Sequence, residues 1–164
     1  MKNKVLIGMM GAGKTTIAKH LSLILHKDYV DMDEYIETKY NMSNSDMFKI
    51  SEDYFREMET HVCKELSKCH DMIIATGGGI IKNYKNIEYL KNNGIIIFID
   101  RPIESIYNDI DISHRPLLKD NKDYLYELYI QRYDLYMSCS DYVIKNTGEL
   151  EIVVKDIIKI VSRS

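Results

Sequence analysis

Residues Gly8–Thr15 read Gly-Met-Met-Gly-Ala-Gly-Lys-Thr, and their types and spacing suit the binding of a nucleoside triphosphate. The glycines let backbone N–H groups turn toward phosphate oxygens, and a following helix adds its positive N-terminal end. Lys14 can then reach the β- and γ-phosphates, while Thr15 can hold Mg²⁺. The alternative is a glycine-rich turn with a chance lysine, but an apolar run and a helical pattern flank the loop as the function requires. The predicted nucleotide contacts are Gly11, Ala12, Gly13, Lys14, Thr15 and Thr16.

Three aspartates at the ends of predicted strands are candidates for metal or proton chemistry. Asp31 and Asp33 end the second apolar run, and strand alternation would point both toward the phosphate side. One carboxylate, Asp31, could hold Mg²⁺ through water, and Asp33 could orient or deprotonate an acceptor hydroxyl. The alternative is that either one caps the following helix. Asp100 ends a later apolar run and could also hold Mg²⁺, but we expect Asp100-Arg101-Pro102 to cap the next helix because Asp31 is a competing metal candidate.

Arg56 and Glu59 are three residues apart in a helical segment, so they share one face of the helix. An arginine on a concave surface can bind a carboxylate through two parallel hydrogen bonds, and the glutamate would hold its guanidinium group in place. The alternative is a solvated ion pair that contributes at most about 0.5 kcal/mol. Arg56 is therefore a candidate anion ligand.

Three consecutive glycines, Gly77, Gly78 and Gly79, come after the apolar run Met72–Ala75. Such a run costs conformational entropy, so something must need the missing side chains. Close approach of backbone N–H groups to a ligand is the natural reason. The alternative is a loose loop, but the position at a strand end favours a ligand.

Two further arginines lie in the C-terminal half of the chain. Arg115 precedes Pro116, which disfavours helix at Arg115 and stiffens the backbone after it. On a mobile flap, Arg115 could close over transferring phosphates, whereas His114 is interpreted as an exposed loop histidine. Arg132 and Tyr136 lie four residues apart in a helical pattern, so Arg132 could be a second anion ligand or a surface arginine.

The composition excludes several classes of function. A chain of 164 residues with a net charge of −3 fits one domain and offers no basic field for nucleic acid. The longest apolar run is too short to span a membrane, and we expect no signal peptide because the predicted first strand begins at once. The three cysteines lack metal spacing and are interpreted as reduced thiols. We expect a cytoplasmic monomer that binds a small molecule and neither nucleic acid nor membrane.

Apolar runs and helical patterns alternate along the chain. The predicted strands are continuously apolar, as in parallel sheets covered on both faces; they are Val5–Ile7, Tyr29–Met32, Met72–Ala75, Ile95–Ile99 and Tyr142–Ile144. The predicted helices are Lys14–Leu25, Asp33–Tyr40, Ser51–Lys68, Tyr84–Asn92, Ile103–Asn108, Lys122–Met137 and Glu149–Val161. This order predicts a three-layer, doubly wound α/β fold with a five-stranded parallel sheet. Residues of about 33–60 and 109–119 resemble insertions over a ligand site at the carboxyl ends of the strands.

In order and approximate spacing, the motifs resemble those of the shikimate kinases from residue 4 to about residue 145. The resemblance is carried by Gly8–Thr15 with Met9-Met10 inside the loop, Asp31-x-Asp33, Phe55-Arg56-x-x-Glu59, Gly77-Gly78-Gly79, Arg115-Pro116-Leu117-Leu118 and Arg132-x-x-x-Tyr136. It implies a P-loop, nucleoside-monophosphate-kinase-like fold with an acceptor-binding insertion and a lid. It also implies phosphorylation of the shikimate 3-hydroxyl by ATP with Mg²⁺, a step toward chorismate and the aromatic amino acids.

The resemblance implies a role for each matched residue. Shikimate would be held by Asp33, Arg56, Gly77, Gly78, Gly79 and Arg132. Arg56 and Arg132 would bind its carboxylate and Asp33 its hydroxyls. Arg115 would be the lid arginine, which brackets the transferring phosphate together with Lys14 and Mg²⁺.

The chain departs from the family in the lid. Shikimate kinases usually carry a second lid arginine several residues before the Arg-Pro-Leu-Leu, and residues 107–111 of this chain contain none. We therefore expect a weaker adenine contact and a lower affinity for ATP. The segment Asn146-Thr147-Gly148 matches the family's adenine loop only loosely.

Two other classes of protein share parts of the pattern. A gluconate or nucleoside monophosphate kinase would have the same loop and fold and use the insertion for another acceptor. A small GTPase-like switch would need an Asn-Lys-x-Asp motif, and Asn121-Lys122-Asp123 has the wrong spacing. The chain also lacks an Asp-x-x-Gly switch.

Overall fold

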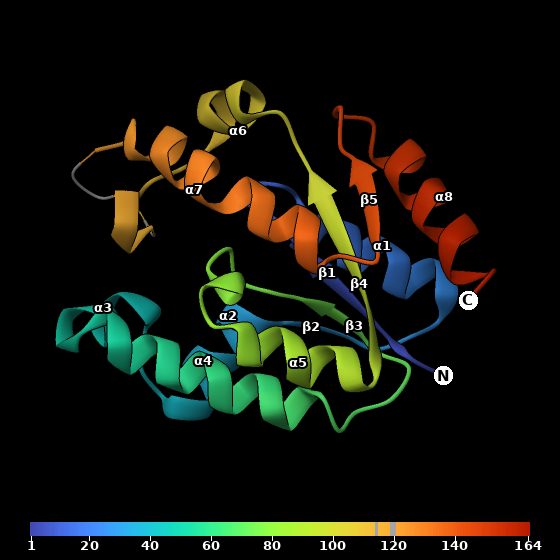
Figure 1. The fold of residues 1–164 in the computed structure, drawn as a ribbon, viewed down its shortest axis with the longest axis horizontal. Helices are drawn as coiled ribbons and strands as arrows, with labels where there is room; N and C mark the ends of the chain where they lie inside the picture. The colour runs from blue at the N-terminus through green and yellow to red at the C-terminus, as the bar shows by residue number, and fades with distance from the viewer. Residues whose placement is uncertain (114, 119–120) are drawn as a thin grey trace.

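The computed structural model describes residues 1–113, 115–118 and 121–164, and it confirms the predicted α/β fold. One parallel sheet has the strand order β2-β3-β1-β4-β5. The strands are β1 (Asn3–Ile7), β2 (Tyr29–Asp31), β3 (Ile73–Ala75), β4 (Gly94–Asp100) and β5 (Tyr142–Lys145). The helices, seen around the sheet in Figure 1, are α1 (Lys14–Leu25), α2 (Met32–Tyr40), α3 (Asn44–Ile50), α4 (Glu52–Leu66), α5 (Tyr84–Asn92), α6 (Ile103–Asp109), α7 (Tyr124–Cys139) and α8 (Leu150–Val161). Short 3₁₀ turns span Ile80–Lys82 and Pro116–Leu118.

The centre of the sheet is covered on both faces, which explains why the apolar residues of β1, β3 and β4 run without alternation. Every residue of the central strand β1 is buried. Val5 and Ile7 pack into a core with residues of α4, α5 and α7, whereas Leu6 faces the opposite core, built with α1 and α8. The molecule is therefore three layers thick, as the alternation of elements predicts.

The step from β2 to α2 corrects one prediction about the aspartates. Asp31 is the N-cap of α2, and its Oδ1 accepts hydrogen bonds from the backbone N–H groups of Asp33 at 2.9 Å and Glu34 at 3.2 Å. Asp33 therefore lies in the first turn of a helix, so strand alternation is the wrong reason for its direction, although both side chains do line the pocket at the phosphate loop as predicted. The capping alternative is confirmed for Asp31, because its carboxylate can satisfy the free N–H groups of the helix start.

The segment Asp100-Arg101-Pro102 does contain the N-cap of the next helix, α6, but the cap is Pro102 and not Asp100. Pro102 makes no side-chain capping hydrogen bond. The Asp100 carboxylate instead accepts a hydrogen bond from the Tyr133 hydroxyl of α7 at 3.3 Å.

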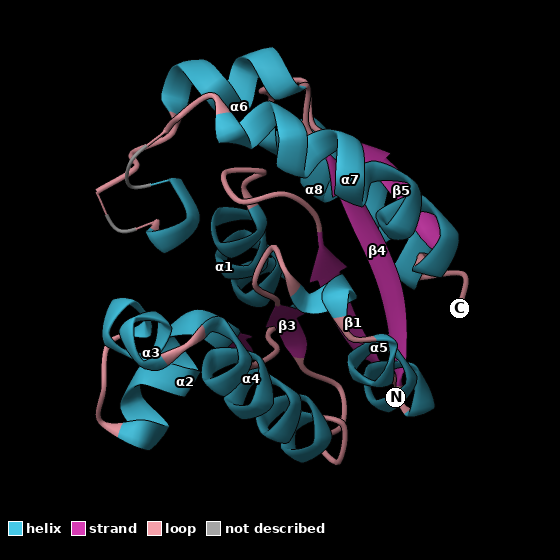
Figure 2. Ribbon diagram, turned by 60° about the vertical axis from the view of Figure 1, so that its left-hand side comes forward, coloured by secondary structure: helices cyan, strands magenta, loops and turns pink. Residues whose placement is uncertain are grey.

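The region of residues 33–60 contains a helix that the hydrophobic pattern does not indicate. Helix α3 begins after Ser43, whose hydroxyl accepts from the backbone N–H of Asp46 at 3.1 Å. Ser51 ends α3 and caps α4. Figure 2 shows α2, α3 and α4 gathered on one side of the molecule and α6 and α7 on the other, with α1 between them.

The predicted lid, about residues 109–119, is only partly described. Helix α6 ends at Asp109, and a 3₁₀ turn covers Pro116–Leu118. His114 and residues 119–120 lie outside the described residues, so the interpretation of His114 stays a prediction. Among the helices that the structure describes, none is long and apolar enough to cross a lipid bilayer.

Candidate active site

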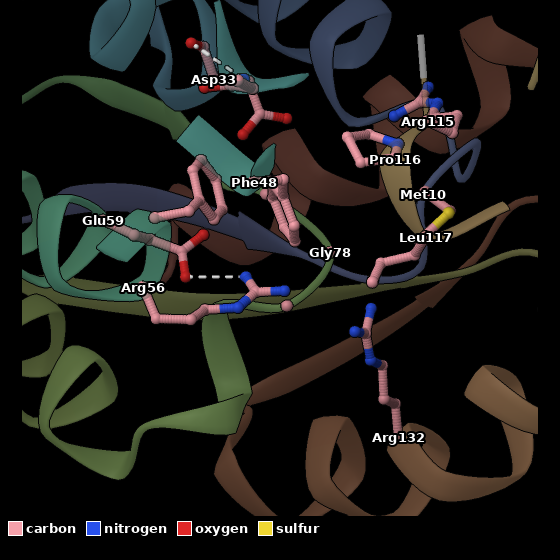
Figure 3. A pocket seen from close by; sticks show the side chains of 14 residues that line it. Met10, Asp33, Phe48, Arg56, Glu59, Gly78, Arg115, Pro116, Leu117 and Arg132 are labelled. Atoms are coloured by element: carbon pink, nitrogen blue, oxygen red, sulfur yellow. Dashed lines mark hydrogen bonds and ion pairs between the residues drawn. The ribbon is translucent and has the colours of Figure 1, made fainter. Parts of the chain in front are cut away.

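Two pockets adjoin at the edge of the sheet where β1, β2 and β3 end. The first, the phosphate pocket, includes Lys14, Thr15 and Asp31 in its lining. The second, the acceptor pocket, includes Arg56, Glu59 and Arg132 and is shown in Figure 3. Both pockets are lined by Met10, Asp33, Gly78 and Arg115. These four residues mark the boundary that a group must cross to pass from one pocket to the other.

The phosphate pocket is formed largely by backbone. Gly13 has a φ of 96°, a conformation that favours glycine, and the chain turns there from the loop into α1. The Lys14 ammonium group donates to the carbonyls of Gly8 and Met9, the latter at 2.9 Å. Gly11, Ala12, Lys14 and Thr15 line the pocket as predicted, whereas Gly13 and Thr16 lie beside it at the start of α1.

The electrostatic environment of Lys14 is set by burial. Loss of water lowers the pKa of its ammonium group from 10.5 to about 7, against the opposing attraction of Asp33. Arg115 lowers the pKa further, while Asp31 raises it. A phosphate bound here would bring the negative charge that favours protonated Lys14.

Thr15 and Asp31 form the candidate metal site. The Thr15 hydroxyl donates to Oδ2 of Asp31, the oxygen that does not cap α2. Across residues 1–113, 115–118 and 121–164, no three His, Cys, Asp or Glu side chains gather into a metal cluster. Mg²⁺ needs no such cluster, because it keeps several waters and uses one or two carboxylates with substrate phosphates. The hydroxyl and the carboxylate therefore fit Mg²⁺.

Asp33 lies on the boundary of the two pockets. Burial raises the pKa of its carboxyl, and the neighbouring charge of Asp31 raises it further, while Lys14, Arg115 and Arg56 act in the opposite direction. A carboxylate with a raised pKa is a stronger proton acceptor. The geometry thus supports both predicted roles, orienting a hydroxyl and accepting its proton.

Arg56 is held at the acceptor pocket by two carboxylates and two aromatic rings. Its Nη1 donates to Glu59 at 3.0 Å, and its Nε and Nη2 each lie 3.4 Å from Glu52. Its Cζ is 5.6 Å from the centre of the Phe48 ring and 5.2 Å from that of Phe55. Because the Arg56 side chain is only 15% exposed, the alternative of a solvated ion pair is wrong.

Glu59 is the buried partner of this pair. Its side chain is 1% exposed, and burial raises the pKa of its carboxyl to about 7, although Arg56 acts to lower it. The negative charge of Glu59 is thus stabilised mainly by the guanidinium group of Arg56. The sequence predicts the same contact, in which Glu59 holds Arg56 in place.

Arg132 reaches the same pocket from α7 and is 3% exposed, so it is not a surface arginine. Its Nη1 is buried without a hydrogen-bond partner among the described residues. An unsatisfied buried donor is unfavourable, and a negatively charged ligand would satisfy it. Figure 3 shows the guanidinium groups of Arg132 and Arg56 directed into one space, with Asp33 and Arg115 on its other side.

The three glycines leave room for the charged side chains of the site. A Cβ atom at Gly77 would lie 2.9 Å from Asp33 Oδ1, and one at Gly79 would lie 2.3 Å from Arg56 Nη1. At Gly78 it would lie 3.0 Å from the backbone nitrogen of Met10 and 3.5 Å from Arg132 Nη1. The loose-loop alternative is therefore wrong. Because the glycines have no side chains, there is room beside them for the carboxylate and guanidinium groups of the site and for a ligand.

Tyr136 fixes this glycine loop to α7. Its hydroxyl donates to the carbonyl of Gly78, and its ring stacks on Phe98 with ring centres 5.1 Å apart. Burial raises the pKa of the hydroxyl to about 12, so it remains a donor at neutral pH. The spacing of Arg132 and Tyr136 thus places an anion ligand and a loop anchor on one face of α7.

Several lining residues were not identified from the sequence as site residues. Asn44 and Phe48 belong to α3, and Met10 and Leu117 lie next to predicted site residues. The Ser43 cap is the one sequence signal for α3, but a helix of seven residues gives little periodicity to detect.

The chain is similar to shikimate kinases over nearly its whole length. The family model for shikimate kinase matches residues 10–162. Shikimate kinase of Clostridium botulinum (strain Alaska E43 / Type E3) is 49% identical, with 98% of each chain covered. That of Clostridium beijerinckii is 44% identical, covering 98% of this chain and 96% of its own.

Solved structures give the same result. Shikimate kinase from Acinetobacter baumannii in complex with shikimate has a TM-score of 0.94 and 33% identity, covering 99% of this chain and 94% of its own. Shikimate kinase from Aquifex aeolicus has a TM-score of 0.85 and 33% identity, covering 98% and 96%. A gluconokinase from Sinorhizobium meliloti, at 9% identity and a TM-score of 0.59 with 99% and 92% covered, shares the fold alone. The chain belongs to the shikimate kinase family.

Proposed function

We propose that this chain transfers the γ-phosphoryl group of ATP to the 3-hydroxyl of shikimate with the residues of the two adjoining pockets. The family gives the reaction, ATP-dependent phosphorylation of shikimate in aromatic amino-acid biosynthesis. One observation supports the residue assignment. The acceptor pocket, which contains the buried Arg132 and the half-buried Arg56, adjoins the phosphate pocket at Asp33 and Arg115.

The acceptor pocket fits a small hydroxy acid. Arg56 and Arg132 bind the carboxylate, which fills the bonding capacity left at Arg132 Nη1. Gly77, Gly78 and Gly79 form the floor of the site, and Asp33 binds the hydroxyl that faces the phosphate pocket. With the carboxylate fixed, only one hydroxyl of the ring can point at phosphorus. Residues of about 33–60 act as the acceptor-binding insertion.

On the nucleotide side, Lys14 and Arg115 neutralise the phosphates of ATP. Arg115 comes from the lid of about residues 109–119. Thr15 and Asp31 would hold Mg²⁺, which when bound would supply positive charge to the phosphate oxygens. Asp33 orients the acceptor hydroxyl and takes its proton as the new oxygen–phosphorus bond forms, while the bond from the γ-phosphorus to its bridging oxygen breaks and ADP leaves.

A coupled assay of ADP release with Mg-ATP tests the reaction, comparing shikimate, gluconate, AMP and no acceptor. We expect strong turnover with shikimate alone, and none from Lys14→Met. Turnover with gluconate or AMP instead would favour the alternative small-molecule kinases. Folded protein that binds ATP but shows no shikimate-dependent turnover would mean that Arg56 and Arg132 are misassigned.

We also propose that the enzyme is a cytoplasmic monomer without nucleic-acid or membrane partners. Light scattering during gel filtration would show one species near the chain mass of 19.2 kDa. A species of twice that mass would contradict the monomer.

A further inference from the structure

Arg101 connects two parts of the nucleotide side that are distant in sequence. It lies between β4 and α6, and its Nη1 donates to the carbonyl of Gly11 in the phosphate loop at 2.9 Å. Its Nη2 forms an ion pair with Asp109, the last residue of α6. The Arg101 side chain is 19% exposed. One guanidinium group therefore joins the phosphate loop to the helix that leads into the lid.

The same peptide of the loop is covered by α6. Gly11 has a φ of 77°, and a Cβ atom there would lie 3.0 Å from Cγ2 of Ile106 and 3.4 Å from Cδ1 of Ile110. A side chain at Gly11 would crowd the side chains of Ile106 and Ile110. A shift of α6 would therefore press on, or release, the backbone at Gly11.

The carbonyls of the loop tip are fixed by side chains from two directions. Arg101 holds the carbonyl of Gly11, and Asn146 Nδ2 donates to the carbonyl of Ala12 at 2.8 Å. The Ala12 N–H closes a turn to Met9 at 3.1 Å. Because C=O and N–H point in opposite directions across a trans peptide, these bonds fix the direction of the N–H groups as well. The conformation of the loop is thus held by hydrogen bonds from the protein's own groups.

We propose that Arg101 is a positioning residue for the nucleotide phosphates and couples the base of the lid to the phosphate loop through Gly11 and Asp109. This inference rests on the proposed use of the loop for ATP. Asp109 balances the charge of Arg101, so the effect arises from the shape of the loop. The lid residue Arg115 lies six positions beyond the end of α6 in the sequence, so α6 is the helix that leads toward the lid.

The planar shape of the guanidinium group, which carries several N–H donors in fixed directions, is essential to this role. The guanidinium group can donate to a carbonyl and to a carboxylate at the same time in fixed geometry, whereas an ammonium group is a single compact donor. Arg101→Lys therefore keeps the charge and weakens the connection, and Arg101→Met removes both. Asp109→Asn keeps a neutral acceptor but removes the charge, so it weakens the connection and leaves the charge of Arg101 unbalanced.

Steady-state kinetics of these variants, with equilibrium binding of ADP, test the inference. We expect Arg101→Met to raise KM for ATP and Kd for ADP about tenfold, the effect of one charged hydrogen bond, with KM for shikimate changed less than twofold. Arg101→Lys should be intermediate, and Asp109→Asn should raise both constants about threefold. The double variant Arg101→Met/Asp109→Asn should be no worse than Arg101→Met. Arg163→Met, an exposed arginine at the C-terminus, is the matched control.

Several outcomes would overturn the inference. If Asp109→Asn lowers KM for ATP, Arg101 acts by direct attraction to phosphate. An equal rise in both KM values, or a fall in Tm with unchanged kinetics, would mean a structural role only. If Arg101→Met does not fold, Arg101→Lys and Asp109→Asn carry the same test. Wild-type protein without shikimate-dependent turnover would instead contradict the proposed function.

Discussion

The phosphate pocket and the acceptor pocket share Asp33, Gly78 and Arg115, but they bind charge in different ways. The first uses backbone N–H groups, a helix N-terminus and one lysine that bonds to its own loop. The second uses arginines from α4 and α7, held by carboxylates and rings, around a loop without side chains. Backbone binds any phosphate, whereas converging arginines select one shape of anion. On the proposed assignment, the difference means that nucleotide binding depends on the loop conformation and acceptor specificity on side-chain packing.

The largest expected effect is at the boundary of the two pockets. We expect Arg115→Ala to lower kcat by roughly 10³-fold with a small change in KM for shikimate, because its cation stabilises the transferring phosphate. Steady-state kinetics measure it, with Arg163→Ala as the control. A raised KM with kcat preserved would place Arg115 in acceptor binding.

Loss of an acceptor arginine should act on binding. We expect Arg56→Ala to raise KM for shikimate roughly a hundredfold and to leave KM for ATP unchanged, since a charged hydrogen-bond pair is lost. Arg132→Ala should behave similarly. The methyl ester of shikimate is the matched ligand control, because it lacks the carboxylate charge. If Arg56→Ala weakens the ester as much as the acid, Arg56 does not bind the carboxylate.

Substitutions at the neighbouring Gly78 and Gly79 should affect the two pockets differently. The Cβ of Gly79→Ala would displace Arg56, so we expect KM for shikimate to rise about tenfold with KM for ATP unchanged. The Cβ of Gly78→Ala would approach the backbone of Met10, so both KM values should rise. Equal effects of the two substitutions on both substrates would mean that the loop moves as one unit.

The smallest expected effect is on stability, and it has opposite signs in the two pockets. The pKa of Glu59 is raised to about 7 by burial, so the folded protein binds the proton more tightly and loses stability as pH rises from 4.5 to 7. The pKa of Lys14 is lowered to about 7, so stability is lost as pH falls from 10.5 to 7. Each slope is at most about 1.4 kcal/mol per pH unit.

Urea unfolding at a series of pH values measures both slopes. Glu59→Gln should remove the decline below pH 7, and Lys14→Met the rise above it. An unchanged pH profile in Glu59→Gln would show that this carboxyl does not titrate in that range.

Local rules account for the elements that the sequence predicts well. The strand–loop–helix order determines the phosphate loop, and the bounds of α1 and α5 agree with the predicted helices. Strand alternation is the wrong reason for the direction of Asp33, because the Asp31 cap starts α2 before the strand pattern ends. The burial of Arg132 depends on packing of α7 against a loop far away in sequence, which no local pattern contains.

The unpaired Nη1 of Arg132 has a consequence for inhibitor design. A fragment that carries a carboxylate would gain a bond that no described side chain or carbonyl of the protein supplies, so a small anion should bind with high efficiency per atom. A neutral group of the same shape would not form this charged hydrogen bond with Arg132 Nη1. Screening libraries for the enzyme should therefore be chosen by charge before size.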